Sequence, residues 1–169
     1  ITPSPGLVLR AFATQTSART SDALDRLVAR RDRSATKAAL ASIAEAAQVG
    51  ARTFSAPDPG AFLESAAAHV EGLERLGQAL DLPLIPAELP LARRLLAEGS
   101  VPSKTSPIVL LPSGAGGGDT VLWLGARAPT DHEALALEGL GLIPLRLTLS
   151  PRGVHSVILP ETNLDADRI

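Results

Sequence analysis

The sequence predicts a single α+β domain, in which a mixed or mostly antiparallel sheet of four to five strands carries its helices on one face. Two observations support this fold class. The expected elements run in the order strand, several helices, strand pair, helix and strand pair, an order typical of split βαβ-type units. A chain of 169 residues without an internal repeat is also long enough for one sizeable core, so we treat residues 1–169 as one domain.

The composition argues against several classes of partner. The net charge is −2 and aromatic residues make up 2% of the chain, so neither charge nor base stacking favours a nucleic-acid partner. Apolar runs are broken by charge, proline or glycine before they reach the length of a membrane span. The absence of cysteine excludes disulfides and fits a reducing cytosol, and we therefore expect a cytoplasmic protein. The chain also lacks methionine, even at position 1, which predicts that it is a piece of a longer protein.

The first third of the chain predicts one strand and two helices. Residues 7–12 have the apolar content of a largely buried strand, and a polar loop over 14–20 follows it. Ser21 can cap a helix that runs to about Arg31, and Ser34 can cap the next helix. The residues expected to face the core are Leu24, Leu27 and Val28 on the first helix and Leu40, Ile43 and Ala47 on the second.

The middle of the chain predicts the longest helix. Asp58 can cap it and Pro59 suits its first turn, and apolar residues then recur at three- and four-residue spacing as far as Leu80. A stretch with three prolines over 82–90 interrupts the helical pattern, and a short helix over 91–97 follows.

The last third predicts two strand pairs around one more helix. Apolar runs over 108–111 and 120–124 flank a glycine-rich segment. Asp131 can cap a helix that ends near Gly139. Residues 143–149 then predict a half-exposed strand, and a turn at 150–153 makes residues 154–159 its expected hairpin partner.

The glycine-rich segment is the strongest functional candidate. Its four glycines allow positive φ, and successive N–H groups that point into one concavity form a nest for phosphate. A flexible turn that only joins two strands explains the same residues equally well. We favour a role for Asp119 in which its carboxylate accepts backbone N–H bonds, with a contact to a substrate hydroxyl as the alternative. The candidate binding residues of this segment are Ser113, Gly114, Ala115, Gly116, Gly117, Gly118 and Asp119.

This segment, with Pro112 and Ser113 before the glycines and Asp119 after them, resembles the third motif of the GHMP kinases and is most like that of the phosphomevalonate kinases. Two further stretches resemble other motifs of the same family more weakly, and they occur in the same order along the chain. The likeness therefore covers about residues 6–155. The residues that carry these two stretches are Thr14, Ala18 and Thr20 in the first and Gly139, Leu140, Gly141, Leu142, Ile143, Pro144, Leu145, Gly153 and Val154 in the second.

The resemblance implies a ferredoxin-like domain that forms the C-terminal half of an ATP-dependent small-molecule kinase. It further implies that the N-terminal half of the same protein binds most of the ATP and Mg²⁺. On this chain, residues 113–118 would donate hydrogen bonds to phosphate, and Ser17 and Thr20 would bind a phosphorylated small-molecule substrate. The resemblance assigns no catalytic residue and no metal ligand to these 169 residues.

Three positions depart from the family pattern. Leu111 stands where the family usually has lysine, Gln15 where it usually has glycine, and Arg19 where it has a small residue. A diverged, non-catalytic domain that binds a ligand or a partner chain is therefore the alternative interpretation. The remaining candidates have structural explanations: His69, His132 and His155 lack the spacing of metal ligands, and Trp123 is expected in the core.

Overall fold

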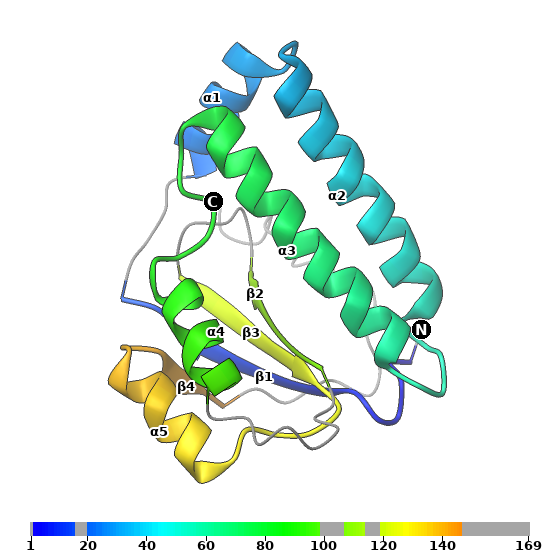
Figure 1. Ribbon diagram of the computed structural model, residues 1–169, viewed down its shortest axis with the longest axis vertical. Helices are drawn as coiled ribbons and strands as arrows, with labels where there is room; N and C mark the ends of the chain where they lie inside the picture. Colours follow the sequence, from blue (N-terminus) through cyan, green and yellow to red (C-terminus); the bar gives the residue numbers. More distant parts are fainter. Residues whose placement is uncertain (1, 16–19, 99–106, 114–118, 147–169) are drawn as a thin grey trace, which may run out of the picture.

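The computed structural model describes residues 2–15, 20–98, 107–113 and 119–146. These residues form an α+β fold with one four-stranded sheet and five helices (Figure 1), which confirms the predicted class. The elements are β1 (Val8–Ala13), α1 (Thr20–Arg30), α2 (Ser34–Thr53), α3 (Gly60–Leu80), α4 (Glu88–Glu98), β2 (Ile108–Pro112), β3 (Thr120–Gly125), α5 (Asp131–Gly139) and β4 (Ile143–Leu145).

The sheet has the strand order β2-β3-β1-β4, and every neighbouring pair is antiparallel. β1 therefore lies inside the sheet although it comes first in the chain. β4 has three residues and forms the edge next to β1. The expected hairpin partner over 154–159 lies outside the described residues.

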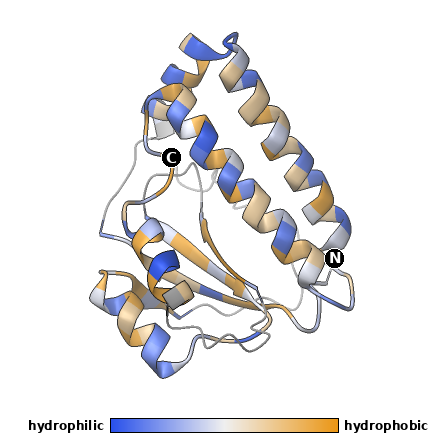
Figure 2. Cartoon of the chain, in the orientation of Figure 1, coloured by the Kyte–Doolittle hydropathy of each residue, from blue (hydrophilic) through white to orange (hydrophobic). Residues whose placement is uncertain are grey.

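The expectation that the helices cover one face of the sheet is wrong. Trp123 and its neighbour Leu110 pack in one cluster with α4 and α5, whereas Leu124 and Val109 pack in another with α3. Because successive side chains of a strand point to opposite faces, the two clusters lie on opposite sides of the sheet. The reason is visible in the continuous apolar runs of β2 and β3, which are coloured mostly as hydrophobic in Figure 2 and must be covered on both faces.

α2 and α3 form a closely packed pair beside the sheet (Figure 1). A Cβ built on Gly72 would lie 2.6 Å from Ile43 Cγ1, so glycine is needed where α3 meets α2. The expected apolar stripe on α2 is partly wrong, because Leu40 and Ala47 are exposed and Ile43 is only half-buried. The close approach selects small residues for the contact, and the buried residues of α2 are Thr36, Ala39, Ala46 and Gly50.

α3 is the longest helix, as predicted, with 21 residues. The cap predicted at Asp58 is one residue early, because the N-cap is Pro59; Asp58 Oδ1 still accepts the backbone N–H of Gly60, the first residue of the helix, at 3.0 Å. At the other end, Asp81 adopts a left-handed conformation with φ 53°, and Leu82 N donates to Gly77 O at 3.0 Å. This is a Schellman-type end with aspartate in the position that usually holds glycine.

α1 contacts the C-terminal end of α3 mainly through hydrogen bonds from two arginines and less through its apolar side chains. Leu24 is 55% and Val28 is 64% exposed, so their predicted place in the core is wrong, and Leu27 is the predicted residue that packs inward. Arg30 donates to the carbonyl of Ala79 at 3.2 Å, and Arg26 donates to the carbonyl of Asp81. Cationic donors complement the free carbonyls at a helix C-terminus and therefore fix α1 against α3.

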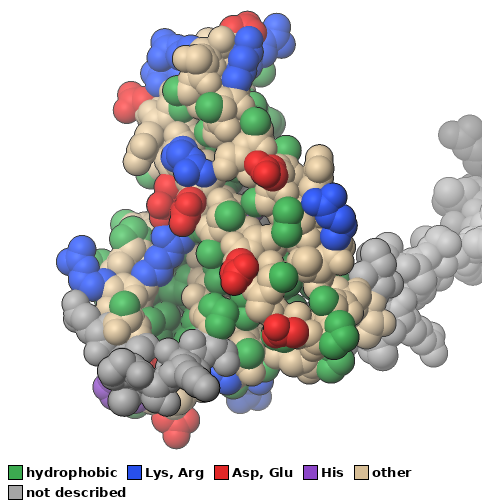
Figure 3. Space-filling model, turned by 45° about the vertical axis from the view of Figure 1, so that its right-hand side comes forward, with side chains coloured by type: hydrophobic (Ala, Val, Ile, Leu, Met, Phe, Trp, Pro, Cys, Tyr) green, Lys and Arg blue, Asp and Glu red, His purple; other side chains and the backbone are tan. Residues whose placement is uncertain are grey.

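The basic residues at this end of the molecule are also partly neutralised. Figure 3 shows blue side chains grouped at the top of the view, where α1 and α2 meet. Asp32 Oδ1 lies 3.4 Å from Lys37 Nζ, and Asp32 Oδ2 lies 3.7 Å from Arg31 Nε. These exposed ion pairs offset part of the positive charge at this end.

Candidate functional site

The sheet brings three of the predicted segments to one of its ends. Ala13, the last residue of β1, pairs with Thr120, the first residue of β3, and also with Ile143, the first residue of β4. Pro112 at the end of β2 pairs with Val121. The strand ends that border segment 114–118, the loop after β1 and the turn before β4 are therefore all at the same side of the sheet. We call this side the loop end.

Backbone hydrogen bonds join to the sheet the two residues that flank segment 114–118. Ser113 N donates to Thr120 O at 2.9 Å, which completes the β2–β3 hairpin up to the first residue of the segment. Thr14 N donates to Asp119 O at 3.0 Å, which extends the β1–β3 ladder beyond the last strand residue. The two described ends of the segment, Ser113 and Asp119, are thus held in the sheet by main-chain bonds.

Asp119 has a left-handed backbone with φ 51°, the conformation that favours glycine or a turn aspartate. Its main-chain carbonyl makes the bond to Thr14, and its side chain is exposed. The N–H donors expected for the carboxylate lie in residues 114–118, outside the described part of the chain, so its role in accepting backbone N–H bonds stays a prediction.

A second left-handed residue completes the same end. Gly141 has φ 84°, and its N–H donates to Glu138 O at 2.8 Å while Leu142 N donates to Leu137 O at 3.0 Å. This pair of bonds is a Schellman motif, and the buried side chains of Leu137 and Leu142 supply its apolar contact. A Cβ on Gly141 would lie 3.0 Å from Gln15 Nε2, so the residue after β1 and the turn before β4 are in contact.

The predicted binding residues divide into those at this end that are described and those that are not. Ser113 is half-buried and Asp119 is exposed at the two ends of the glycine-rich segment, and Thr20 is the first residue of α1. The remaining predicted residues lie outside the described part of the chain: Ser17, Gly114, Ala115, Gly116, Gly117 and Gly118.

Comparison with known proteins gives one informative likeness. No protein-family model and no curated protein matches this sequence. Among solved structures, the chain is similar to the crystal structure of a Lin0012 protein from Listeria innocua, with 21% identity and a TM-score of 0.66. The likeness is one of fold. It covers 86% of this chain but 39% of that protein, so this chain spans about two fifths of the length of its structural neighbour.

The opposite end of the sheet is held by side chains. We call this group, formed by Trp123, Arg127, Thr130 and Glu133, the ion-pair end. Arg127 Nη1 and Nη2 each lie 2.6 Å from one oxygen of the Glu133 carboxylate, and the buried indole of Trp123 donates to the carbonyl of Arg127 at 3.0 Å. The guanidinium carbon also lies 5.9 Å from the centre of the indole ring. A bidentate pair of this kind fixes both partners in one geometry.

The same carboxylate caps α5. Thr130 accepts a bond from Glu133 N, and the Glu133 carboxylate accepts one from Thr130 N at 2.8 Å, which is a capping box. The hydrogen bonds from Arg127 have the largest effect on the pKa of Glu133 and lower it; burial opposes them, and the bonds from Thr130 lower it further, so that the pKa is about 2. The cap predicted at Asp131 is therefore one residue late. The sequence T-x-x-E over 130–133 was the signal that could have found it.

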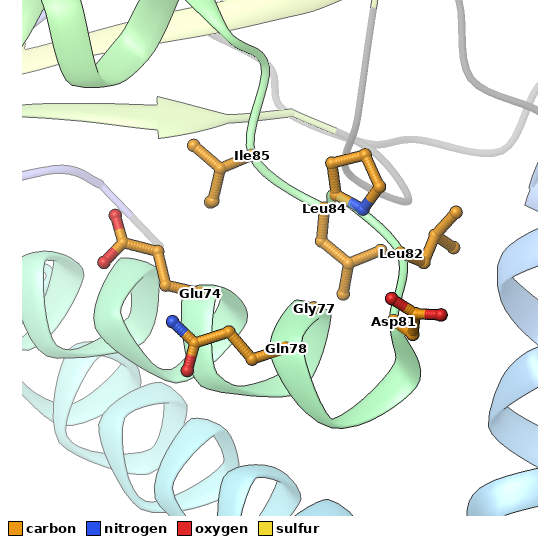
Figure 4. A pocket seen from close by; sticks show the side chains of 8 residues that line it. Glu74, Gly77, Gln78, Asp81, Leu82, Leu84 and Ile85 are labelled. Atoms are coloured by element: carbon orange, nitrogen blue, oxygen red, sulfur yellow. The ribbon is translucent and has the colours of Figure 1, made fainter.

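A cavity of about 370 Å³ lies beside the C-terminal end of α3 (Figure 4). Figure 4 shows Glu74 and Gln78 on one side of it, projecting from α3, and Leu84 and Ile85 on the other. The acids around it already have cationic partners, because Glu74 is paired with Arg93 and the carboxylate of Asp81 lies 4.0 Å from Arg30. Its lining therefore does not favour a bound cation.

Two kinds of feature are absent from residues 2–15, 20–98, 107–113 and 119–146. Within these ranges no three His, Asp or Glu side chains gather in a way that could hold a metal ion. None of the helices in the described part is long and apolar enough to cross a membrane.

Proposed function

We propose that this chain is the C-terminal, substrate-binding half of a phosphomevalonate-kinase-like GHMP enzyme. Such an enzyme transfers the γ-phosphoryl group of ATP to a phosphorylated small molecule of the mevalonate route to isoprenoids. One observation supports the proposal most. The first segment that resembles a family motif lies about ninety residues before the second, and the third follows about twenty residues later, yet the strand ends that carry all three are neighbours at the loop end.

In the proposed enzyme this chain contributes position and hydrogen-bond donors. Phosphoryl transfer depends mostly on alignment of the reactants and on neutralisation of charge on the phosphoryl oxygens. Ser113 and the amides of residues 114–118 would donate to a phosphate group, and Ser17 and Thr20 would orient the acceptor. ATP with Mg²⁺ supplies the phosphoryl group and much of the charge neutralisation. The family resemblance assigns the binding of ATP and Mg²⁺ mainly to the N-terminal half of the protein.

A non-catalytic, ligand-binding domain is the second candidate, and Leu111 favours it. The family usually has a lysine at this position, where a cation would help to balance phosphate charge. In this chain the leucine side chain lines an apolar cavity between the sheet and the α2–α3 pair. Loss of one charge-assisted contact costs about 1–3 kcal/mol, which would weaken phosphate binding without removing it.

The kinase proposal is tested on the longer protein that includes the sequence upstream of Ile1. We expect ATP consumption that depends on phosphomevalonate, and we expect Gly117→Val to lower it at least tenfold, because a branched side chain would block the approach of phosphate to the amides. Gly139→Val is the matched control, since a Cβ on Gly139 meets no atom within 4 Å. Equal turnover by the two variants would contradict a role of the glycine-rich segment in the reaction.

A titration of the 169-residue chain with inorganic phosphate, followed by backbone amide resonances, distinguishes the ligand-binding alternative from the kinase proposal. Saturable shifts of the amides of residues 113–119, together with no ATP consumption by the longer protein, would support the non-catalytic domain. Saturable shifts together with phosphomevalonate-dependent turnover would support the kinase. An absence of shifts at these amides would contradict both proposals.

A further inference from the structure

A second cavity, of about 230 Å³, lies between the α2–α3 pair and the sheet. Its floor is formed by Leu111 of β2 and Leu124 of β3, on the face of the sheet that α3 covers. It belongs to neither the glycine-rich segment nor the ion-pair end.

The cavity exists because the helix that roofs it has small side chains there. α2 presents Gly50 and three alanines to this space, so the helix backbone is near but few side-chain atoms fill the volume. Phe54 and Phe62 border it as an edge-to-face pair with ring centres 5.2 Å apart and planes at 70°. Aromatic edges and methyl groups make walls that hold hydrocarbon more favourably than water.

One polar side chain on the wall, that of His69, has no hydrogen-bond partner among the described residues. His69 is half-buried and lines the cavity, and its imidazole makes no hydrogen bond to any residue that the structure describes. The other polar side chain of the lining, Ser65, already donates its hydroxyl to Phe62 O at 2.7 Å. The imidazole is therefore the polar contact that the cavity offers to a ligand.

We propose that this cavity is a binding site for a small neutral molecule, a branched or cyclic hydrocarbon body with one hydroxyl or carbonyl group that hydrogen-bonds to His69. The volume, about 230 Å³ and open to solvent on one side, is sufficient for this size, because benzene fits an enclosed apolar cavity of about 150 Å³. The lining holds no arginine or lysine, so an anionic group would lose its hydration there without a partner. The site thus takes a different chemical class from the phosphate proposed for the loop end, and it does not depend on that proposal.

The test uses benzyl alcohol and toluene as probes, because they share a ring and differ by one hydroxyl. Each is titrated into the isotopically labelled 169-residue chain, and methyl and imidazole resonances are followed. We expect saturable shifts at the methyl groups of Leu111 and Leu124 with both probes. We further expect benzyl alcohol to bind at least threefold more tightly than toluene and to move the His69 ring resonances.

Three variants distinguish binding of the probes in the cavity from nonspecific adsorption to the protein surface. Ala47→Leu places a larger side chain on the lining and should weaken both probes at least tenfold. Ala44→Leu is the matched control, because Ala44 is also exposed on α2 but does not line the cavity, and it should bind as the wild type does. His69→Leu should keep the affinity for toluene and remove the preference for benzyl alcohol.

Shifts spread over the whole surface, or equal affinities in Ala47→Leu and Ala44→Leu, would overturn the proposal. A preference for benzyl alcohol that survives in His69→Leu would overturn the role of the imidazole. The far-ultraviolet circular dichroism of each variant shows that it is folded, so a loss of binding can be assigned to the cavity. These readouts are independent of phosphate binding at residues 113–119.

Discussion

The two ends of the sheet are fixed by different means. At the ion-pair end, side chains make the structure: the Trp123 indole, the Arg127 guanidinium and the Glu133 carboxylate are joined by hydrogen bonds of 2.6 to 3.0 Å. At the loop end, the described contacts are made by main-chain groups, and two residues, Asp119 and Gly141, have left-handed backbones. α5 connects the two, because it begins after Arg127 and ends at the turn before β4.

The difference shows how one domain can combine a rigid frame with a surface that is free to bind. Side chains at the ion-pair end are already satisfied by each other, so little of their hydrogen-bonding capacity remains for a ligand. At the loop end the hydrogen bonds named above join main-chain groups, so a ligand there need not break a bidentate ion pair. A change at the ion-pair end should therefore act on stability, and a change at the loop end should act on binding.

The largest effect is expected from Trp123→Ala. The indole is fully buried, packs against α4 and α5, and donates to the Arg127 carbonyl, so its removal leaves a cavity and an unpaired acceptor. We expect the free energy of unfolding to fall by about 3–5 kcal/mol in urea denaturation. Leu135→Ala on α5, where the side chain is 67% exposed, should change it by less than about 0.5 kcal/mol. Similar losses in both variants would contradict the ion-pair end as the frame of the fold.

Glu133→Ala should have the next largest effect, because it removes the bidentate contact with Arg127 and the capping box together. We expect a loss of about 2–3 kcal/mol at pH 7, measured by urea denaturation. The pKa of Glu133 is lowered from 4.5 to about 2 in the folded chain, so the stabilisation is fully present above pH 4.5 and is lost as the pH falls toward 2. The gap between wild type and variant should therefore close over that window. A gap that stays constant to pH 2 would show that the carboxylate charge is not its source, and Glu138→Ala on the exposed side of α5 serves as the control.

Sequence patterns predicted most elements of the fold. The five helices and four strands of the described residues all overlap the ranges that periodicity predicts, but several boundaries differ. The N-caps of α2, α3 and α5 are Arg33, Pro59 and Thr130, each one residue from the predicted cap. α4 begins at Glu88 instead of residue 91.

Which face of each helix packs against its neighbour was harder to predict. Leu24 and Val28 have helical spacing, but α1 is held by Arg26 and Arg30, whose acceptors on α3 are about fifty residues away. A pattern of neighbouring residues cannot predict hydrogen bonds between groups so far apart in the sequence.

The candidate site was predictable in its parts but not in its assembly. The glycine-rich segment and the loop after β1 are visible in the sequence as separate stretches. That they leave the sheet at the same end depends on β1 pairing with both β3 and β4, a register set by long-range contacts. The cavity beside His69 could not be predicted, because it results from the small residues of one helix facing two strands that are distant in sequence.

Gly141→Ala tests how the loop end is held. The left-handed φ of 84° is unfavourable for alanine, and the new Cβ would press on the Gln15 amide. We expect a loss of about 1–2 kcal/mol in the free energy of unfolding, mostly from the backbone. Gly139→Ala, two residues earlier, meets open space inside the last helical turn and should be neutral or stabilise by up to about 1 kcal/mol. Equal effects at the two positions would show that the turn before β4 is not constrained.

Asp119→Asn should have the smallest effect on stability and the most specific effect on binding. Asparagine tolerates a left-handed backbone, and the bond to Thr14 uses the main-chain carbonyl, so we expect a stability change below about 0.5 kcal/mol. If phosphate binds the glycine-rich segment as proposed, removal of the adjacent negative charge should tighten it. Two unit charges 4 Å apart in water repel by about 1 kcal/mol, which corresponds to roughly a fivefold gain in affinity at low salt that shrinks as salt is added. Phosphate titrations followed by amide resonances measure this gain. Asp131→Asn removes an equal charge near the ion-pair end and should leave the affinity unchanged, so an equal gain in both variants would show that phosphate responds to net charge and not to the loop end.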